Sequence, residues 1–262
     1  MPTMPPPHGI RNCAFDGAPF EIPPEGISLT ECVLRHLSFD GYLIAVFFAR
    51  GCVVESCDFR RAYLDKGYFG GGEGAGFSQT VYRDCTFDGA VLEGMSFGSA
   101  RFERCSFRDV RLRRWLSFSA EFVDCVFAGE IPEAAFLGRP PLPATVRKQN
   151  EFRGNDFSQA KFGSVEFRGG IDLRLQRLPP GDGAAVLDRR AERIAASLAK
   201  IEMWPDAAER HSASHYLGLY GGSRYDGQEQ LYLPNRPSRL LSEELRRRVV
   251  DLLKNCLPSE AG

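Results

Sequence analysis

The sequence predicts a mainly β protein, in which short strands wind into a four-sided coil that is followed by a small α-helical region. Three observations support this prediction. Large apolar residues recur every five positions over much of residues 11–178, cysteines and opposite charges recur every twenty, and the five-residue pattern stops after Pro179 and Pro180. A helix has a period of about 3.6 and a strand a period of about two, so neither explains a period of five.

Residues 1–10 are predicted to be a disordered tail. They lack the charged segment and apolar core of a signal peptide, and the longest apolar run in the chain is the eight residues Tyr42–Ala49, which is too short for a transmembrane helix. We therefore expect a cytoplasmic protein that does not enter a membrane. The eight cysteines are accordingly expected to be reduced thiols.

The period of five predicts two inward-facing residues per repeat. A large residue is preceded, two positions earlier, by a smaller one, and residues two apart in an extended backbone face the same side. The remaining positions must turn the chain through a corner. The clearest inward pairs form a predicted core ladder of Cys85 with Phe87, Cys105 with Phe107, and Cys125 with Phe127.

The spacing of twenty predicts four sides per coil, because equivalent residues on successive coils should stack. Cys85, Cys105 and Cys125 have this spacing, and so do charges of opposite sign. Neighbouring strands lie about 4.8 Å apart, where opposite charges attract and like charges repel. The predicted pairs are Arg35–Glu55, Asp40–Arg60, Arg83–Glu103, Asp84–Arg104, Asp88–Arg108, Glu93–Arg113, Arg101–Glu121 and Arg104–Asp124.

Three segments depart from the repeat. The small-then-large order is inverted at Trp115 and Ser117, which indicates either a volume-conserving exchange or a one-residue slip onto Leu116 and Phe118. The register is also broken by residues 70–78 and by residues 128–149. A coil can leave its path only at the surface, so we expect these two segments to be projecting loops.

The repeat resembles a known family. The triplets Cys57-Asp58-Phe59, Cys85-Thr86-Phe87, Cys105-Ser106-Phe107 and Asn155-Asp156-Phe157 look like the central positions of pentapeptide repeats. The resemblance covers roughly residues 11–170 and implies a right-handed quadrilateral β-helix, a solenoid in which each coil packs on its neighbours. Some bacterial members bind type II topoisomerases by mimicking duplex DNA, so the resemblance also implies DNA gyrase as a possible partner.

Residues 179–262 are predicted to form helices that cap the solenoid or bind a partner. Leu187, Ala191, Ile194, Leu198 and Ile201 place one apolar stripe along a first helix. A second is expected from about Pro205 to Tyr220. A third should begin after Ser242, which is a suitable N-cap residue.

The apolar run near Phe48 is the candidate partner interface. If the repeat register holds, Leu43, Ala45, Val46 and Phe48 face outward. An outward apolar cluster indicates either a partner surface, which includes a homodimer contact, or a region covered by the chain itself. Both alternatives stay open.

No segment predicts catalytic, cofactor-binding or metal-binding residues. His211 and His215 are four apart on an expected helix but lack a third ligand and a metalloprotease glutamate. The glycine-rich loop at residues 70–78 lacks the Gly-Lys-Ser/Thr of a phosphate loop. The chain is therefore expected not to be an enzyme; an enzyme or metal-binding protein that uses the C-terminal helices is the weaker alternative.

The overall charge predicts no direct binding to nucleic acid. Lys and Arg number 33 against 34 Asp and Glu, so no global charge attracts a polyanion. The preferred interpretation is a non-enzymatic protein–protein interaction module with an unidentified partner. The alternative is a gyrase-binding resistance or protection protein of the DNA-mimic type. That function requires an acidic face, whereas residues 82–127 contain balancing charges.

Overall fold

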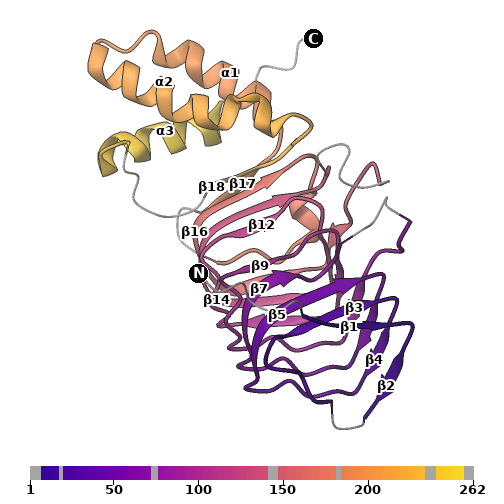
Figure 1. Ribbon diagram of the computed structural model, residues 1–262. Coiled ribbons are helices and arrows are strands. Elements are labelled where there is room, and N and C mark those ends of the chain that lie inside the picture. The colour runs from indigo at the N-terminus through magenta and orange to yellow at the C-terminus, as the bar shows by residue number, and fades with distance from the viewer. Residues whose placement is uncertain are drawn as a thin grey trace, which may run out of the picture. The chain divides into compact units, whose positions relative to one another are not determined.

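The computed structural model describes residues 7–17, 20–71, 76–140, 147–180, 184–233 and 240–256 (Figure 1). The chain forms two compact units. The first comprises Met1–Glu166 and Arg174–Pro179, and the second comprises Phe167–Leu173 and Pro180–Gly262. The first unit is mainly β and the second contains three helices.

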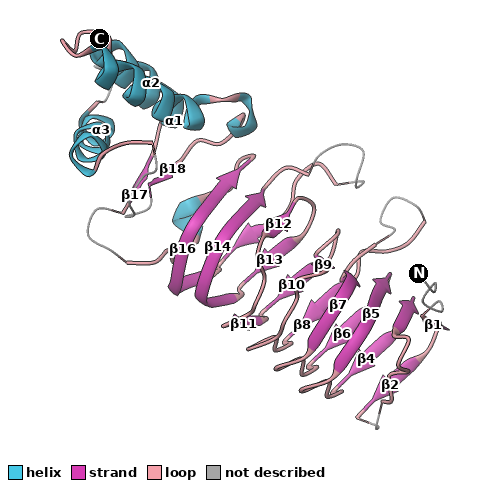
Figure 2. Cartoon of the chain, turned by 60° about the vertical axis from the view of Figure 1, so that its left-hand side comes forward, coloured by secondary structure: helices cyan, strands magenta, loops and turns pink. Residues whose placement is uncertain are grey.

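Short parallel strands, arranged as in a β-helix, build the first unit (Figure 2). They are β1 (His8–Arg11), β2 (Ala14–Asp16), β3 (Ile27–Thr30), β4 (Val33–Arg35), β5 (Leu43–Arg50), β6 (Val53–Glu55), β7 (Tyr63–Tyr68), β8 (Val81–Arg83), β9 (Met95–Ser96), β10 (Arg101–Glu103), β11 (Ser106–Arg108), β12 (Trp115–Ser117), β13 (Glu121–Val123), β14 (Val126–Leu137), β15 (Phe152–Arg153) and β16 (Asp156–Arg168), the last of which ends in the second unit.

Three parallel sheets run through these coils. One has the order β1-β3-β5-β7-β9, the second has the order β15-β13-β10-β8-β6-β4-β2, and in the third β14 pairs with β11, β12 and β16. The register aligns Arg101 with Glu121 and Phe107 with Phe127, at the predicted offset. Val54 instead aligns with Tyr82, and Phe122 with Phe152, because these coils contain the two inserted segments.

Stacked aromatic rings fill the interior of the first unit. Phe39, Phe59, Phe87, Phe107, Phe127 and Phe157 form one continuous stack, with successive ring centroids 4.5 to 5.2 Å apart. Each such pair contributes about 0.5–1.5 kcal/mol beyond the burial of its surface. The predicted core ladder is therefore confirmed for Phe87, Phe107 and Phe127.

The cysteines of the predicted ladder are also core residues. Cys85, Cys105 and Cys125 are buried free thiols. Their sulfur atoms lie 3.4 to 3.5 Å from backbone carbonyl oxygens of the preceding coil, to which they donate weak hydrogen bonds. Burial is the largest cause of the raised pKa of the Cys105 thiol. A protonated, enclosed thiol serves packing and is poorly suited to nucleophilic chemistry.

Two predicted boundaries of the first unit were wrong. His8–Arg11 pairs with Ile27–Thr30, so residues 8–10 lie in a strand and not in a disordered tail; residues 1–6 lie outside the described residues. The second expected loop starts later than predicted, because strand β14 continues to Leu137. Its Ile131, Ala134 and Phe136 are buried, although their spacing no longer follows the repeat.

Three helices and one strand pair form the second unit. Its elements are a 3₁₀ turn (Leu173–Leu175) shared with the first unit, β17 (Ala185–Leu187), α1 (Arg190–Ile201), α2 (Ala207–Gly221), a second 3₁₀ turn (Ser223–Tyr225), β18 (Leu231–Leu233) and α3 (Glu243–Asn255). The Ser242 hydroxyl accepts a hydrogen bond from the Leu245 N–H, so the predicted N-cap of the third helix is confirmed. The first helix starts after Leu187 because residues 185–187 pair with β18.

Arginines of α1 bind the last turns of the other two helices, beside a hydrophobic core that includes Ile194, Leu217 and Val249. Arg193 of α1 donates to the carbonyl oxygens of Leu253 and Lys254 at the end of α3, at 2.9 Å each. The buried Arg190 likewise donates to the Tyr220 carbonyl at the end of α2. The carbonyls of a last helical turn have no partner within their helix and attract cations. Whether this unit caps the solenoid or binds a partner stays a prediction.

Candidate interaction surfaces

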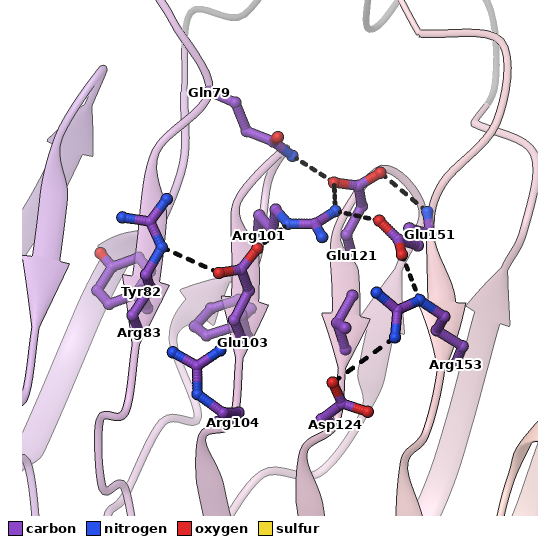
Figure 3. Close-up of polar contacts among 12 residues, drawn as sticks. Gln79, Tyr82, Arg83, Arg101, Glu103, Arg104, Glu121, Asp124, Glu151 and Arg153 are labelled. Carbon is purple, nitrogen blue, oxygen red and sulfur yellow. Dashed lines mark hydrogen bonds and ion pairs between the residues drawn. The ribbon is translucent and has the colours of Figure 1, made fainter.

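Alternating charges cover the sheet β15-β13-β10-β8-β6-β4-β2, which we call the charged sheet (Figure 3). Arg83 of β8 lies between two carboxylates, 2.8 Å from Glu55 and 2.9 Å from Glu103. Glu55 also binds Arg35 at 2.7 Å. The hydrogen bond from Arg35 and then that from Arg83 lower the pKa of the Glu55 carboxyl. Each of these carboxylates is therefore neutralised by arginines on adjacent coils.

Arg101 forms three ion pairs on this sheet. Its guanidinium lies 2.5 Å from Glu103, 3.0 Å from Glu121 and 2.7 Å from Glu151 (Figure 3). Glu121 is buried and also binds Arg147 at 2.8 Å. A buried carboxylate is stable only when it is paired and hydrogen-bonded, as it is here. This network links three successive coils and serves the stacking of the solenoid.

Most of the ion pairs predicted from the spacing of twenty are present. Arg35–Glu55, Arg83–Glu103, Asp84–Arg104, Asp88–Arg108 and Arg101–Glu121 are confirmed. Three were wrong. Asp40 binds Arg61 and Arg60 binds Asp58, since neighbouring side chains on the same corner compete for the predicted partners. Asp124 pairs with Arg153 in place of Arg104, and Glu93 and Arg113 form no ion pair within the described residues.

The four residues of the candidate partner interface do not form one exposed patch. Leu43 is 81% exposed, but Val46 is only 3% exposed and Ala45 and Phe48 are half-buried. Gly26 lies directly against Val46, because a Cβ atom built on this glycine would be 2.8 Å from the Val46 Cβ. Of the two alternatives for an outward apolar residue, cover by the chain itself therefore holds at Val46.

Phe48 packs against a side chain of the neighbouring coil. Its ring stacks on Tyr68 of β7 with centroids 4.6 Å apart, and the Tyr68 hydroxyl accepts a 2.6 Å hydrogen bond from Arg50. Such cross-strand aromatic pairs stabilise a sheet by about 0.2–1 kcal/mol. Of the predicted interface, only Leu43 remains as a freely accessible large apolar side chain.

A hollow of about 780 Å³ lies instead between β9 and β12, where sequence reasoning predicted no site. Met95, Phe97, Leu112, Leu116 and Phe118 supply its apolar lining. Its charged lining residues are Glu93, Arg113, Arg114 and Glu133. Binding sites for small ligands and peptide side chains have volumes of this order. Phe118 is 44% exposed, so the apolar lining is accessible from solvent.

The β-ladder is interrupted at this hollow. Strand β9 is the last strand in the order β1-β3-β5-β7-β9, whereas β12 pairs with β14 in another sheet. The repeat would align Met95 with Trp115, twenty residues on, but the ladders of the described residues do not join these strands. The same interruption explains why Glu93 and Arg113 are not paired.

Trp115 lies at the interruption of the ladder. It is fully enclosed and stacks on Phe97, with ring centroids 5.5 Å apart and planes inclined by 24°. Trp115 occupies an inward position that the repeat usually gives to a small residue, so we attribute the missing pairing of β12 with β9 to the volume of the indole. On the other side it lies opposite Ala134, while Ser117 lies opposite Phe136. The inverted order is thus a volume-conserving exchange and not a slip, and Phe118 points outward.

None of the remaining chemical candidates is a lining residue of this hollow. His211 and His215 are exposed on α2, and no group of three or more His, Cys, Asp or Glu residues in the described part of the chain could hold a metal ion. Of the glycine-rich segment, residues 72–75 lie outside the described residues. None of the helices that the structure describes is long and apolar enough to cross a membrane.

Comparison with known proteins agrees with the repeat architecture. Residues 77–121 match the family model for pentapeptide repeats, with nine copies. Residues 77–121 are therefore identified as pentapeptide repeats. A solved structure of trypsin-treated QnrB1, described as a plasmid-mediated fluoroquinolone resistance protein, matches this chain at 15% sequence identity. The match covers 65% of this chain and 87% of that one, with a TM-score of 0.25. No curated protein matches this chain.

Proposed function

We propose that this chain is a non-enzymatic protein–protein interaction module, whose first unit is a right-handed quadrilateral β-helix that presents the hollow between β9 and β12 to a protein partner. The observation that carries the proposal is a contrast between two surfaces. On the charged sheet, arginines and carboxylates neutralise one another from coil to coil. At the hollow, an exposed phenylalanine adjoins four charged side chains that form no ion pairs within the described residues.

An accessible apolar surface with a charged rim is typical of protein interfaces. Aromatic side chains are enriched in interface cores, and charged side chains surround them. Two arginines and two glutamates line the hollow, so their formal charges cancel. A nucleic acid requires a predominantly positive surface, which favours a protein over a polyanion as the partner of this site.

Site-specific photo-crosslinking in the native host tests the proposal. A photo-reactive phenylalanine analogue replaces Phe118 in one full-length variant and Leu43 in another. Both positions are exposed, so the second variant is a matched control. We expect a discrete crosslinked protein from position 118 that is absent or much weaker from position 43. Equal labelling at both positions, or none at 118, would contradict an interaction module that uses this hollow.

The DNA-mimic alternative receives less support from the charge pattern. Gyrase binding of that type needs a continuous acidic face, and on the charged sheet Glu55, Glu103 and Glu121 each bind at least one arginine. The other alternative, a metal-dependent activity of the helical unit, rests on His211 and His215. Metal analysis of the purified full chain tests it, and we expect no bound metal in stoichiometric amount.

A further inference from the structure

The hollow between β9 and β12 contains a free strand edge in addition to its apolar side chains. In the solenoid, outward-facing residues bond to the preceding coil. Arg101 of β10, for example, donates its N–H to the Thr80 carbonyl at 2.9 Å. Leu116 is the outward residue of β12, so the same alternation directs its N–H and C=O toward β9. No ladder of the described residues joins these two strands.

From this geometry we infer that the hollow accepts an extended segment of the partner protein, which adds as a short strand to the free edge of β12. The inference rests on the proposed function and names the form of the partner. An extended backbone carries one donor and one acceptor per residue, which is the complement of the Leu116 N–H and C=O. Addition of a peptide strand to a free sheet edge is an established mode of peptide recognition.

The side chains around the edge define the chemistry of the segment. Among the lining residues of the hollow, Leu112 is buried, while Met95, Leu116 and Phe118 are partly accessible. Alternate residues of an added strand point to the same side. A segment with apolar side chains at every second position can therefore place them against these residues while its backbone pairs with Leu116.

The rim does not select one sign of charge. Arg113 and Arg114 precede β12, and Glu93 precedes β9, with Glu133 of β14 nearby. All four are exposed and form no ion pair with one another or with any other described residue. We therefore expect binding to depend only weakly on ionic strength. A strong decrease with salt would instead indicate a polyanion, such as nucleic acid.

Fluorescence anisotropy with defined probes tests the inference on the full-length chain. The first probe is a short labelled peptide of alternating valine and threonine. The second has the same side chains, but alternate backbone nitrogens are methylated, which removes donors and blocks strand pairing. We expect saturable binding of the first probe and binding of the second that is at least about tenfold weaker, as the loss of one or two backbone hydrogen bonds predicts.

A pair of variants locates the binding. Leu116→Lys places a charge on the free edge, a change that discourages strand addition. Val53→Lys makes the same change on β6, at a half-buried position that is aligned with Val33 of β4 on one side and Val81 of β8 on the other. We expect about a tenfold loss of affinity for the first variant and no change for the second. Thermal unfolding of both variants excludes a folding defect as the cause.

Several outcomes would overturn the inference. Equal binding of the two probes, binding that survives Leu116→Lys, or no binding of either probe would each exclude strand addition at β12. Concentration-dependent dimerisation that Leu116→Lys abolishes, without peptide binding, would assign the edge to a second copy of the chain. If neither peptide binds while position 118 still crosslinks to a host protein, the proposed function is retained and only strand addition is excluded.

Discussion

Trp115 stacks on Phe97 across the interruption in the β-ladder, with ring centroids 5.5 Å apart. The contact keeps the aromatic interior continuous where the backbone pairing stops. Phe97 also stacks on Phe69 of the preceding coil, so the three rings form one column. A large residue in a position usually given to a small one thus opens the surface of the solenoid without leaving its interior unfilled.

Replacement of the Trp115 indole should both destabilise the interior and close the gap between β12 and β9. We expect Trp115→Ala to lower the free energy of unfolding by about 3–5 kcal/mol, because it leaves a large cavity. It should also weaken binding of the alternating peptide, since β12 is then free to approach β9. Urea unfolding and anisotropy measure the two effects.

Phe122→Ala is the matched control for Trp115→Ala. Phe122 is equally buried and stacks on Phe102, but its strand β13 is paired with β10 and β15. The Phe122→Ala substitution should lower the free energy of unfolding by a similar amount and leave peptide binding intact. Parallel loss of binding in both variants would show that Trp115 acts only through stability.

Val46 and Leu43 should respond differently to the same change. An aspartate at position 46 would be buried without a partner, whereas one at position 43 would be solvated. We expect Val46→Asp to lower the free energy of unfolding by several kcal/mol and Leu43→Asp to change it by less than about 0.5 kcal/mol. Urea denaturation of the two variants measures both free energies of unfolding. Similar stabilities would mean that Gly26 does not cover Val46.

Gly67 should not tolerate a side chain. Its φ of +146° lies outside the range that other residues adopt, and a Cβ atom would lie 1.8 Å from the Phe47 carbonyl oxygen. We expect Gly67→Ala to lower the free energy of unfolding by at least about 2 kcal/mol, through backbone strain and displacement of β5 from β7. In Gly9→Ala, the new methyl group meets no atom within 4 Å, so its thermal midpoint should remain near that of the unaltered chain.

The charged sheet should lose stability in acid. Hydrogen bonds from Arg35 and Arg83 lower the pKa of Glu55 in the folded protein, and that from Arg104 lowers the pKa of Asp84. A lowered folded-state pKa means that the unfolded chain binds protons first as the pH falls. The stabilisation is therefore complete well above pH 4.5, the ordinary value for Glu55, and is lost as the pH falls through the lowered folded-state pKa.

Thermal unfolding between neutral and acidic pH measures this dependence. We expect Glu55→Gln to flatten the acid side of the stability profile and Glu133→Gln, whose carboxylate has no ion pair within the described residues, to leave it unchanged. An identical profile for Glu55→Gln and the unaltered chain would show that the Arg35–Glu55–Arg83 contacts contribute nothing to folding.

Gyrase offers a functional test of the same neutralised surface. Because the carboxylates of the charged sheet are paired with arginines, we expect a large excess of the full chain to leave gyrase supercoiling and its inhibition by quinolones unchanged. Protection of the enzyme at comparable concentrations would restore the DNA-mimic alternative and would require an acidic surface elsewhere on the molecule.

The sequence allowed the stacked interior to be predicted because Phe87, Phe107 and Phe127 obey a strict period, and local spacing determines which residues meet in a solenoid. The same logic located the partners of Glu103 and Arg104. It left open whether Val46 is accessible, because its cover comes from the backbone of Gly26 and spacing does not encode that contact. It failed along β14, where Pro132 breaks the repeat while the strand continues to Leu137.

The candidate interaction site could be predicted only in part from the sequence. The exchange of sizes at Trp115 and Ser117 was a recognisable departure, but its consequence depends on the indole lying between Phe97 on one coil and Ala134 on the other. A residue pattern gives the volume of a side chain and not the distance by which it separates two strands. Positions at which the residue order of a repeat is inverted, but the total side-chain volume is conserved, are therefore candidate functional sites in other solenoids.

Amide hydrogen exchange at Leu116 tests the central claim most directly. In the free chain, the Leu116 amide should exchange at least about tenfold faster than that of Arg101, its counterpart on the paired strand β10, because its N–H faces the hollow. Addition of the alternating peptide or of the crosslinked host protein should slow exchange at Leu116 and leave Arg101 unchanged. Equal protection of the two amides in the free chain, or no change at Leu116 on binding, would contradict a free strand edge that receives a partner.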